Sequence, residues 1–337
     1  MLIKENQPLS NLNTFGIHVN ARMYVEVNTD DALNELCTAE GLFSGEHLIL
    51  GEGSNILFTR NYPGTVIRMI TKGMEVIDRK NGHVYLRVKA GEIWDDLVSF
   101  CVRKGWGGLE NLSLIPGQVG SSPIQNIGAY GVELEQHFVS LEAYDKSEKK
   151  TVVFSHEDCQ FSYRNSLFKS RGDNRYLITS VTFRLDEKPI VNTSYGNINQ
   201  ELNDMGVGSA GITEVREAVC RIRRRKLPDP EQLGNAGSFF KNPIVSMKEF
   251  QGLKEKHPDI VAYPMGSHMK LAAGWLIDKA GWKGFRRKDA GVHEKQALVL
   301  VNHGSASGND ILDLAREITQ SVKQTFGVIL EPEVNII

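Results

Sequence analysis

The chain has 337 residues, of which 41% are hydrophobic and 24% are charged, the composition of a soluble globular protein with two or three domains. Its formal net charge of −2 provides no globally basic surface, which argues against nucleic acid or an acidic membrane as a partner. No apolar run approaches the roughly 20 residues of a membrane span, and the first residues lack a signal peptide's apolar core, so we expect a cytoplasmic protein.

The first part of the chain places a glycine loop between predicted strands. A strand is predicted at 21–27, and a helix follows that Thr29 or Asp30 caps and Gly41 stops. Further strands at 47–50, 56–58 and 64–68 surround the loop, which consists of Gly51, Glu52, Gly53, Ser54 and Asn55. Because a strand and not a helix follows, the loop is not a Rossmann or P-loop turn. It is either a backbone nest for a diphosphate or a hairpin turn without a ligand.

A second glycine-rich stretch follows a well-marked helix. After strands at 74–77 and 84–88, apolar residues at 94, 97, 98 and 101 predict a helix that ends at Gly105. Residues 115–131, which we call the cradle, then carry four glycines and no charge. Backbone of this kind can close on a flat or phosphorylated ligand, although a buried turn without a ligand is the alternative.

Two basic features lie in the middle of the chain. Strands are predicted at 139–144, 151–154 and 176–185, and Arg164 stands among aromatic residues between the last two. Such an arginine is usually a surface cation stacked on a ring. A helix predicted at 213–226 gathers Arg223, Lys226 and three other basic residues at its end. These cations either complement the helix dipole or form an anion site.

The C-terminal part begins where residues 227–230 break the helix and mark a domain boundary. A third small-residue loop at 234–243 presents Ser238 without a G-x-S-x-G elbow, so a proton donor or a ligand contact is predicted rather than an acyl-enzyme nucleophile. An α+β unit follows with a helix at 271–280 and a strand at 297–301. The final helix is capped by Asn309 or Asp310 and stopped at Gly327. A last strand at 330–334 carries Glu331 and Glu333, which are either solvated or catalytic.

Cysteine and histidine spacing bears on metals and disulfides. The four cysteines form no C-x-x-C pair, and the nine histidines show no ligand spacing. We therefore expect reduced thiols and no metal site.

Seven motifs occur in an order that resembles the UDP-N-acetylenolpyruvoylglucosamine reductase family over nearly the full chain. They are residues 51–55, the cradle, Tyr163-Arg164-Asn165-Ser166, Ile222-Arg223 with Lys226-Leu227-Pro228, residues 234–243, residues 270–277 and Glu331-Pro332-Glu333-Val334. The segment Ser194-Tyr195-Gly196-Asn197, together with Tyr130, resembles the branch that has a substrate-capping tyrosine loop.

The resemblance implies an α+β protein with the vanillyl-alcohol-oxidase-like FAD-binding fold. It implies an FAD-binding subdomain of residues 1–72 and 328–337, a second one of residues 73–226, and a C-terminal α+β substrate domain of residues 227–327. FAD would lie between the two subdomains, with its diphosphate on the 51–55 loop and the cradle. The implied cofactor-binding residues are Gly51, Glu52, Gly53, Ser54, Asn55, Ile115, Pro116, Gly120, Ser121, Ser122, Gly128, Tyr130, Gly131 and Arg223.

The implied reaction reduces UDP-N-acetylglucosamine enolpyruvate to UDP-N-acetylmuramate with NADPH, a step in peptidoglycan precursor synthesis. The resemblance places Arg164 and Glu333 at the substrate carboxylate and makes Ser238 the proton donor to C2. The implied substrate contacts are Tyr195, Lys226, Asn242 and Gln296. We expect a monomer with a small-molecule UDP-sugar as its substrate.

Two positions depart from the family pattern. Asn335 stands where many relatives have arginine, so we do not carry over a positive charge there, and Gln118 stands where cysteine is frequent. Two rival interpretations remain at this stage. The chain could be another FAD-dependent oxidase or dehydrogenase of the same fold, or a nucleotide-sugar sensor without catalysis.

Overall fold

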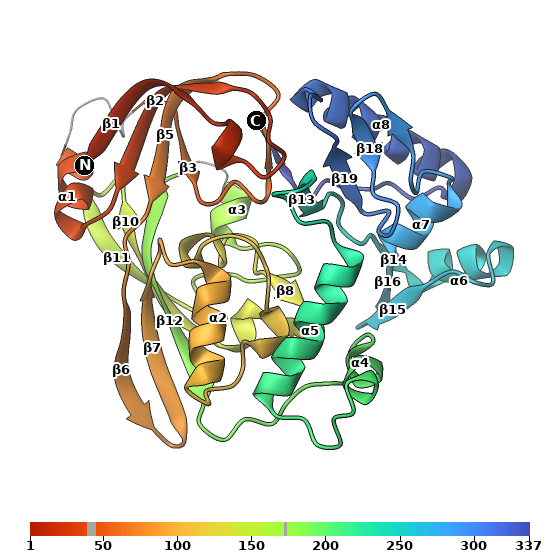
Figure 1. The fold of residues 1–337 in the computed structure, drawn as a ribbon, viewed down its shortest axis with the longest axis horizontal. Coiled ribbons are helices and arrows are strands. Elements are labelled where there is room, and N and C mark those ends of the chain that lie inside the picture. Colours follow the sequence, from red (N-terminus) through yellow and green to blue (C-terminus); the bar gives the residue numbers. More distant parts are fainter. Residues whose placement is uncertain (39–44, 172–173) are drawn as a thin grey trace. The chain divides into compact units, whose positions relative to one another are not determined.

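The computed structural model describes residues 1–38, 45–171 and 174–337 and divides into two compact units (Figure 1). The first unit comprises residues 1–7, 21–52 and 62–225, and the second comprises residues 8–20, 53–61 and 226–337. Along the chain, the first unit ends at Arg225 and the second resumes at Lys226. The assignment of three functional domains stays a prediction, and Gly41, the predicted helix stop, lies outside the described residues.

A four-stranded sheet begins the first unit, in the order β1 (Leu2–Pro8), β2 (Asn20–Val27), β5 (Tyr62–Met69), β3 (His47–Leu50). The strands β2 and β3 both run parallel to β5. The helix α1 (Asp30–Thr38) follows β2. Thr29, one of the two predicted caps, precedes this helix, and its hydroxyl accepts a hydrogen bond from the Ala32 amide at 3.1 Å. Leu36 on this helix packs with Val25 and Ile67 of the sheet.

A five-stranded antiparallel sheet forms the larger part of the first unit. Its order is β11 (Lys150–Ser155), β10 (Phe138–Asp145), β12 (Tyr176–Asp186), β7 (His83–Lys89), β6 (Met74–Lys80). The predicted apolar face of α2 (Trp94–Arg103) packs onto this sheet, with Trp94 edge-on to Phe183 at 5.9 Å between ring centroids. The strands predicted from alternation and the helix predicted from its 3.6-residue period are therefore confirmed here.

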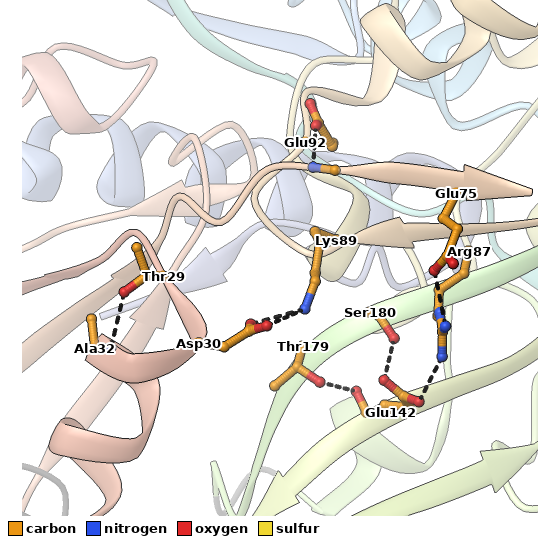
Figure 2. Close-up of polar contacts among 11 residues, drawn as sticks. Thr29, Asp30, Ala32, Glu75, Arg87, Lys89, Glu92, Glu142, Thr179 and Ser180 are labelled. Carbon is orange, nitrogen blue, oxygen red and sulfur yellow. Dashed lines mark hydrogen bonds and ion pairs between the residues drawn. The ribbon is translucent and has the colours of Figure 1, made fainter.

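Polar contacts link this sheet to the neighbouring helix (Figure 2). Lys89 of β7 binds both carboxylate oxygens of Asp30, at 2.8 and 2.9 Å, in the first turn of α1. Within the sheet, Glu142 accepts the Ser180 hydroxyl at 2.8 Å. These contacts join segments that are 59 and 38 residues apart in the chain.

The remaining elements of the first unit are mostly short. They are the 3₁₀ turns η2 (Glu110–Leu112), η3 (Val119–Ser121) and η4 (Leu134–Gln136), the strands β8 (Gly128–Ala129) and β9 (Val132–Glu133), and the helices α3 (Leu167–Arg171), α4 (Ile198–Asp204) and α5 (Ile212–Lys226). The cradle therefore contains η3 and β8.

The second unit is built on an antiparallel sheet in the order β13 (Gly234–Ser238), β19 (Val299–Asn302), β18 (Ala290–Val292), β17 (Arg286–Arg287). Its longest helix is α8 (Gly308–Phe326), whose predicted apolar stripe is buried and which ends at Gly327 in the left-handed conformation. The remaining elements are η1 (Ser10–Leu12), β4 (Ile56–Leu57), β14 (Ile244–Ser246), α6 (Met247–Lys256), β15 (Ala262–Met265), β16 (His268–Leu271), α7 (Ala273–Lys279) and β20 (Asn335–Ile336).

Four local predictions in the second unit are wrong. Ser307, and not Asn309 or Asp310, caps α8, because Asp310 is the third residue of a capping box. The segment 234–238 is a strand and not a loop, and Leu271 ends β16 so that α7 starts only at Ala273. The last strand occupies 335–336 beside β4, and the predicted strand at 330–334 is reduced to one antiparallel bridge between Pro332 and Phe240, because the amides of Asn335 and Ile337 donate to the β4 segment instead.

None of the helices in the described part of the chain combines the length and the apolar character that crossing a bilayer requires.

The buried carboxylate of Asp145 supports the five-stranded sheet and provides a pH-dependent test. Hydrogen bonds from Arg175, and further ones from the amides of Ser147 and Glu148, hold its pKa at about 2. Its stabilisation is therefore complete above the usual aspartate pKa of about 4 and is lost as the pH falls through about 2. We expect Asp145→Asn to lower the unfolding free energy by about 1–3 kcal/mol at pH 7. The difference from wild type, measured by urea unfolding, should shrink from pH 4 towards pH 2.5.

The exposed pair of Arg316 and Asp313 provides the control. Asp313→Asn should change the unfolding free energy little at any pH. A difference for Asp145→Asn that stays constant down to pH 2.5 would contradict the role of the ionised carboxylate.

Candidate functional site

An ion pair between Asp95 and Arg216 holds the backbone at the start of the cradle. Leu114 has a left-handed backbone, with φ 56°, and its amide donates to the Asp95 carboxylate at 2.6 Å. Arg216 of α5 binds both oxygens of the same carboxylate, at 2.7 and 2.8 Å. Burial raises the pKa of Asp95, but the hydrogen bonds from Arg216 and the Leu114 amide outweigh it and leave the pKa below its usual value. Helices α2 and α5 together thus hold the residues before Ile115 and Pro116.

The 51–55 loop begins beside the cradle. A single ligand held by both segments would require this proximity. A Cβ at Gly51 would lie 3.4 Å from Gln118 Oε1 and 3.5 Å from Ser121 Oγ. These residues, with Gly120, Ile124 and others, line a pocket of about 40 Å³ that is partly open to solvent. The narrow space beside Gly51 suits a ligand that approaches the backbone closely.

The negative charge of Glu52 would repel an anionic ligand if no cation compensated it. Arg68 of β5 pairs with it, since Arg68 Nη2 lies 2.8 Å from Glu52 Oε1. The buried Arg68 Nε has no hydrogen-bond partner among the described residues. The sequence analysis did not identify Arg68, because no sequence pattern indicates that Glu52 pairs with a residue 16 positions further along the chain.

Of the two cradle serines, Ser121 ends the turn η3 and Ser122 follows it. The Ser121 hydroxyl donates to the Gln118 carbonyl at 2.8 Å, and the Ser122 hydroxyl donates to the Val119 carbonyl at 2.7 Å. A Cβ at Gly120 would lie 2.6 Å from Ala90 Cβ, so only glycine lets this turn approach the strand end. A phosphate at Ser121 would compete with Gln118 for the hydroxyl proton.

Arg164 points into the cradle and not into solvent. It lies at the tip of a tight hairpin closed by hydrogen bonds between Ser162 and Asn165, with φ 54°. Its guanidinium donates to the Gly128 carbonyl and lies 3.8 Å from Glu133. It also stacks on Tyr163, with 5.1 Å from its Cζ to the ring centroid, but only 17% of its side chain is exposed. Arg164 therefore stacks on a ring as a surface cation would, but its side chain is not exposed like that of a surface cation.

A buried cluster joins the end of the cradle to the tyrosine loop. Arg223 of α5 lies close to Tyr130, and burial lowers the pKa of Arg223 and raises that of Tyr130. Arg223 keeps some solvent-accessible surface, yet its Nε has no partner among the described residues. A Cβ at Gly131 would lie 2.9 Å from Tyr195 Cβ, so this tyrosine sits directly beside the cradle.

Asn111 connects these two segments and was missed by sequence reasoning. It is 1% exposed and donates to the carbonyls of Tyr130, at 3.0 Å, and Asn192, at 2.9 Å. The available signal was that two leucines, Leu109 and Leu112, flank the Glu110-Asn111 pair.

The basic residues at the end of α5 do not form one anion site. Arg221 pairs with Glu217 at 2.8 Å, and Arg225 pairs with Glu201 at 2.6 Å. Arg223 is turned towards the cradle, whereas Lys226 ends the helix and is exposed.

The second unit holds the other group of predicted site residues. The Glu333 amide donates to the Phe239 carbonyl at 2.8 Å, which places Glu333 beside the strand that carries Ser238. The Asn55 side chain donates to the Glu333 carbonyl at 3.3 Å, so the end of the 51–55 loop approaches the same segment. The Ser238 hydroxyl makes no hydrogen bond to any residue in the described ranges.

Asn242 and Gln296 meet at the start of α7. Asn242 Oδ1 accepts the Ala273 amide at 2.9 Å, and a Cβ at Gly274 would lie 3.0 Å from Gln296 Oε1. The Asn242 amide group keeps its two N–H donors for another partner in this arrangement.

Two family models match the chain. The model described as FAD binding domain matches residues 21–153, and the model described as UDP-N-acetylenolpyruvoylglucosamine reductase, C-terminal domain, matches residues 229–337. The first match contains the Gly51 loop and the cradle, and the second contains Ser238 and Glu333.

Similar proteins support the same family over the full length. The UDP-N-acetylenolpyruvoylglucosamine reductase of Amoebophilus asiaticus is 47% identical over 338 residues, covering 100% of both chains. That of Pseudomonas aeruginosa is 46% identical, covering 99% of this chain and 98% of the relative. The crystal structure of the reductase from Thermus caldophilus is similar with a TM-score of 0.70 and 25% identity, covering 100% of this chain and 99% of that one.

Proposed function

Because this chain belongs to the UDP-N-acetylenolpyruvoylglucosamine reductase family, we propose that it reduces UDP-N-acetylglucosamine enolpyruvate to UDP-N-acetylmuramate with NADPH. It is an FAD-dependent oxidoreductase of peptidoglycan precursor synthesis, and the family uses FAD and NADPH. The observation that carries the proposal is 47% identity to such a reductase over the whole of both chains.

The described residues fit FAD. The glycine at position 51 leaves space beside Ser121, the cradle carries no charged side chain, and Arg68 balances Glu52. The residues that would hold FAD are those of the 51–55 loop, the cradle residues Ile115, Pro116, Gly120, Ser121, Ser122, Gly128, Tyr130 and Gly131, and Arg223. When bound, FAD would supply the hydride chemistry, taking a hydride from NADPH and passing it to C3 of the enolpyruvyl group.

Hydride addition at C3 places negative charge on C2 and the adjoining carboxylate. Arg164 offers a charged guanidinium that is mostly shielded from solvent, where an ion pair with the substrate carboxylate is strong. The Ser238 hydroxyl, unengaged within the described protein, donates its proton to C2. A serine is a weak acid, but a carbanion-like carbon is basic enough to accept its proton. Glu333 assists at the carboxylate only when it is protonated or donates through a neighbouring group, because a bare carboxylate would repel it.

Four further residues contact the UDP-sugar in this proposal. Lys226 supplies a charge for the diphosphate, and Tyr195 covers the substrate from beside the cradle. Asn242 and Gln296 act from the start of α7. The substrate is a small molecule, and we expect the monomer to act in the cytoplasm.

An anaerobic experiment tests both halves of the reaction. The purified protein is reduced with NADPH while the flavin band near roughly 450 nm is followed, and the enolpyruvyl substrate is then added. Bleaching followed by rapid return of the band is expected. A band that bleaches and stays bleached would indicate a flavoprotein with a different acceptor, and the absence of a band after adding FAD would overturn the cofactor assignment.

The space beside Gly51 allows a test of the FAD site that spares the fold. Since a Cβ there would make ordinary contacts of 3.4 Å or more, Gly51→Ala should unfold at the wild-type temperature. The methyl group would occupy the space beside Ser121, so we expect FAD binding, measured by titration of the apoprotein, to weaken about 10-fold or more, about 1.4 kcal/mol. The control is Gly208→Ala, because a Cβ at Gly208 meets open space. Unchanged FAD affinity in Gly51→Ala would place the diphosphate elsewhere.

A further inference from the structure

The strand that carries Ser238 contains an irregularity immediately before the serine. β13 pairs with β19 so that Asn235 lies opposite Val301 and Ser238 lies opposite Val299. Three steps along β13 therefore match two steps along β19, which is a β-bulge with one extra residue. Within this bulge Gly237 has φ 67°, which a residue with a side chain adopts only with strain. Bulges of this kind change the direction of the next side chain.

The side chain of Asn235 holds this bulge. It is 3% exposed, and its Oδ1 accepts the Gly237 amide at 2.9 Å. Its amide group donates to the carbonyls of Leu233, at 2.8 Å, and Pro228, at 3.2 Å. The first bond fixes the Ala236–Gly237 peptide, one residue before Ser238, and the other two anchor the asparagine to the connection that follows Lys226.

We propose that Asn235 is a positioning residue that aims the Ser238 hydroxyl at C2 of the substrate by holding the bulge at Gly237. The proposal rests on the proposed role of Ser238 as proton donor and deepens it. Asn235 itself touches no reacting atom, so its contribution passes entirely through Ser238. Loss of the Asn235 side chain leaves the Gly237 amide without its acceptor and lets the bulge relax towards other backbone conformations. The serine oxygen then spends less time in the productive geometry.

The neighbouring strand offers a matched control. Asn302 of β19 is 5% exposed, and its Oδ1 accepts the amides of Gly304 and Ala306 while its amide group donates to the Phe15 carbonyl. It therefore resembles Asn235 in burial and in the number of side-chain hydrogen bonds. None of these bonds touches the bulge. Asn302→Ala reports what the loss of a buried asparagine in this sheet does by itself.

The test compares both half-reactions in the intact FAD-loaded protein by stopped-flow spectroscopy. We expect Asn235→Ala to leave flavin reduction by NADPH at the wild-type rate and to slow reoxidation by the enolpyruvyl substrate about 10- to 100-fold. Asn302→Ala should change both rates less than about 3-fold at a similar loss of thermal stability. In the Ser238→Ala background, Asn235→Ala should slow reoxidation no further, because the two residues act as one unit.

Three outcomes separate the possible failures. If Ser238→Ala reoxidises at the wild-type rate, the proposed function of Ser238 fails. If Ser238→Ala is slow but Asn235→Ala behaves like Asn302→Ala, or multiplies the effect of Ser238→Ala, the positioning role is overturned. Gly237→Ala provides a second variant if Asn235→Ala does not fold, since its Cβ meets open space and only strains the bulge. It should show the same selective slowing, and equal slowing of both half-reactions would contradict the proposal.

Discussion

Replacing Ser238 with alanine should slow reoxidation of the reduced flavin by the enolpyruvyl substrate at least about 100-fold, the effect of losing a general acid. The side chain is small and only partly buried, and its hydroxyl makes no hydrogen bond to the described residues, so the fold should be unaffected. Flavin reduction by NADPH needs no proton from this serine and should keep its wild-type rate. Anaerobic stopped-flow measurements at 450 nm separate the two steps.

Ser238→Cys is the matched control for this prediction. A thiol is nearly isosteric and is a stronger acid than an alcohol, so the cysteine variant should retain more of the reoxidation rate than the alanine variant. Equal loss in the two variants, or equal slowing of both half-reactions by Ser238→Ala, would remove the proton-donor role.

Replacing Arg164 with alanine should also act on the reoxidation step, by about 100- to 1,000-fold, which corresponds to about 3–4 kcal/mol of lost electrostatic stabilisation. The guanidinium is mostly buried and lies next to Glu133 and the Gly128 carbonyl, so water cannot readily replace its charge. Arg164→Lys should recover part of the rate, since it keeps the charge but loses the planar two-donor geometry.

Arg316→Ala is the control for Arg164→Ala, because it removes an exposed arginine of α8 that pairs with Asp313. It should leave both half-reactions unchanged. Full turnover by Arg164→Ala would contradict the proposed role and would indicate that Arg164 is a stacked cation without catalytic function.

The sequence alone determined the features that depend on neighbours a few residues away. Helices α2, α5 and α8 follow from apolar residues at 3.6-residue spacing, and Gly105 and Gly327 end α2 and α8 in the left-handed conformation. The strands of the five-stranded sheet follow from alternation. The absence of a helix after the Gly51 loop, which excludes a Rossmann turn, is confirmed. The order of the motifs was sufficient to indicate the family.

One error was also local and could have been avoided. Ser307 with Asp310 is a recognisable capping box. The glycines of 234–238 concealed a strand because its hydrogen bonds come from β19, about 65 residues further along the chain.

Only the tertiary structure decided how the candidate site residues are supported. Arg68 neutralises Glu52 from another strand, Asn111 links the cradle to the segment before Tyr195, and Arg223 turns inward while Arg221 and Arg225 pair at the surface. Asn235 holds the bulge before Ser238 by bonds that include the Pro228 carbonyl. Each of these arrangements depends on hydrogen bonds or charges brought together by folding. Periodicity and composition describe which residues are buried, but they contain no information about which buried polar groups become partners.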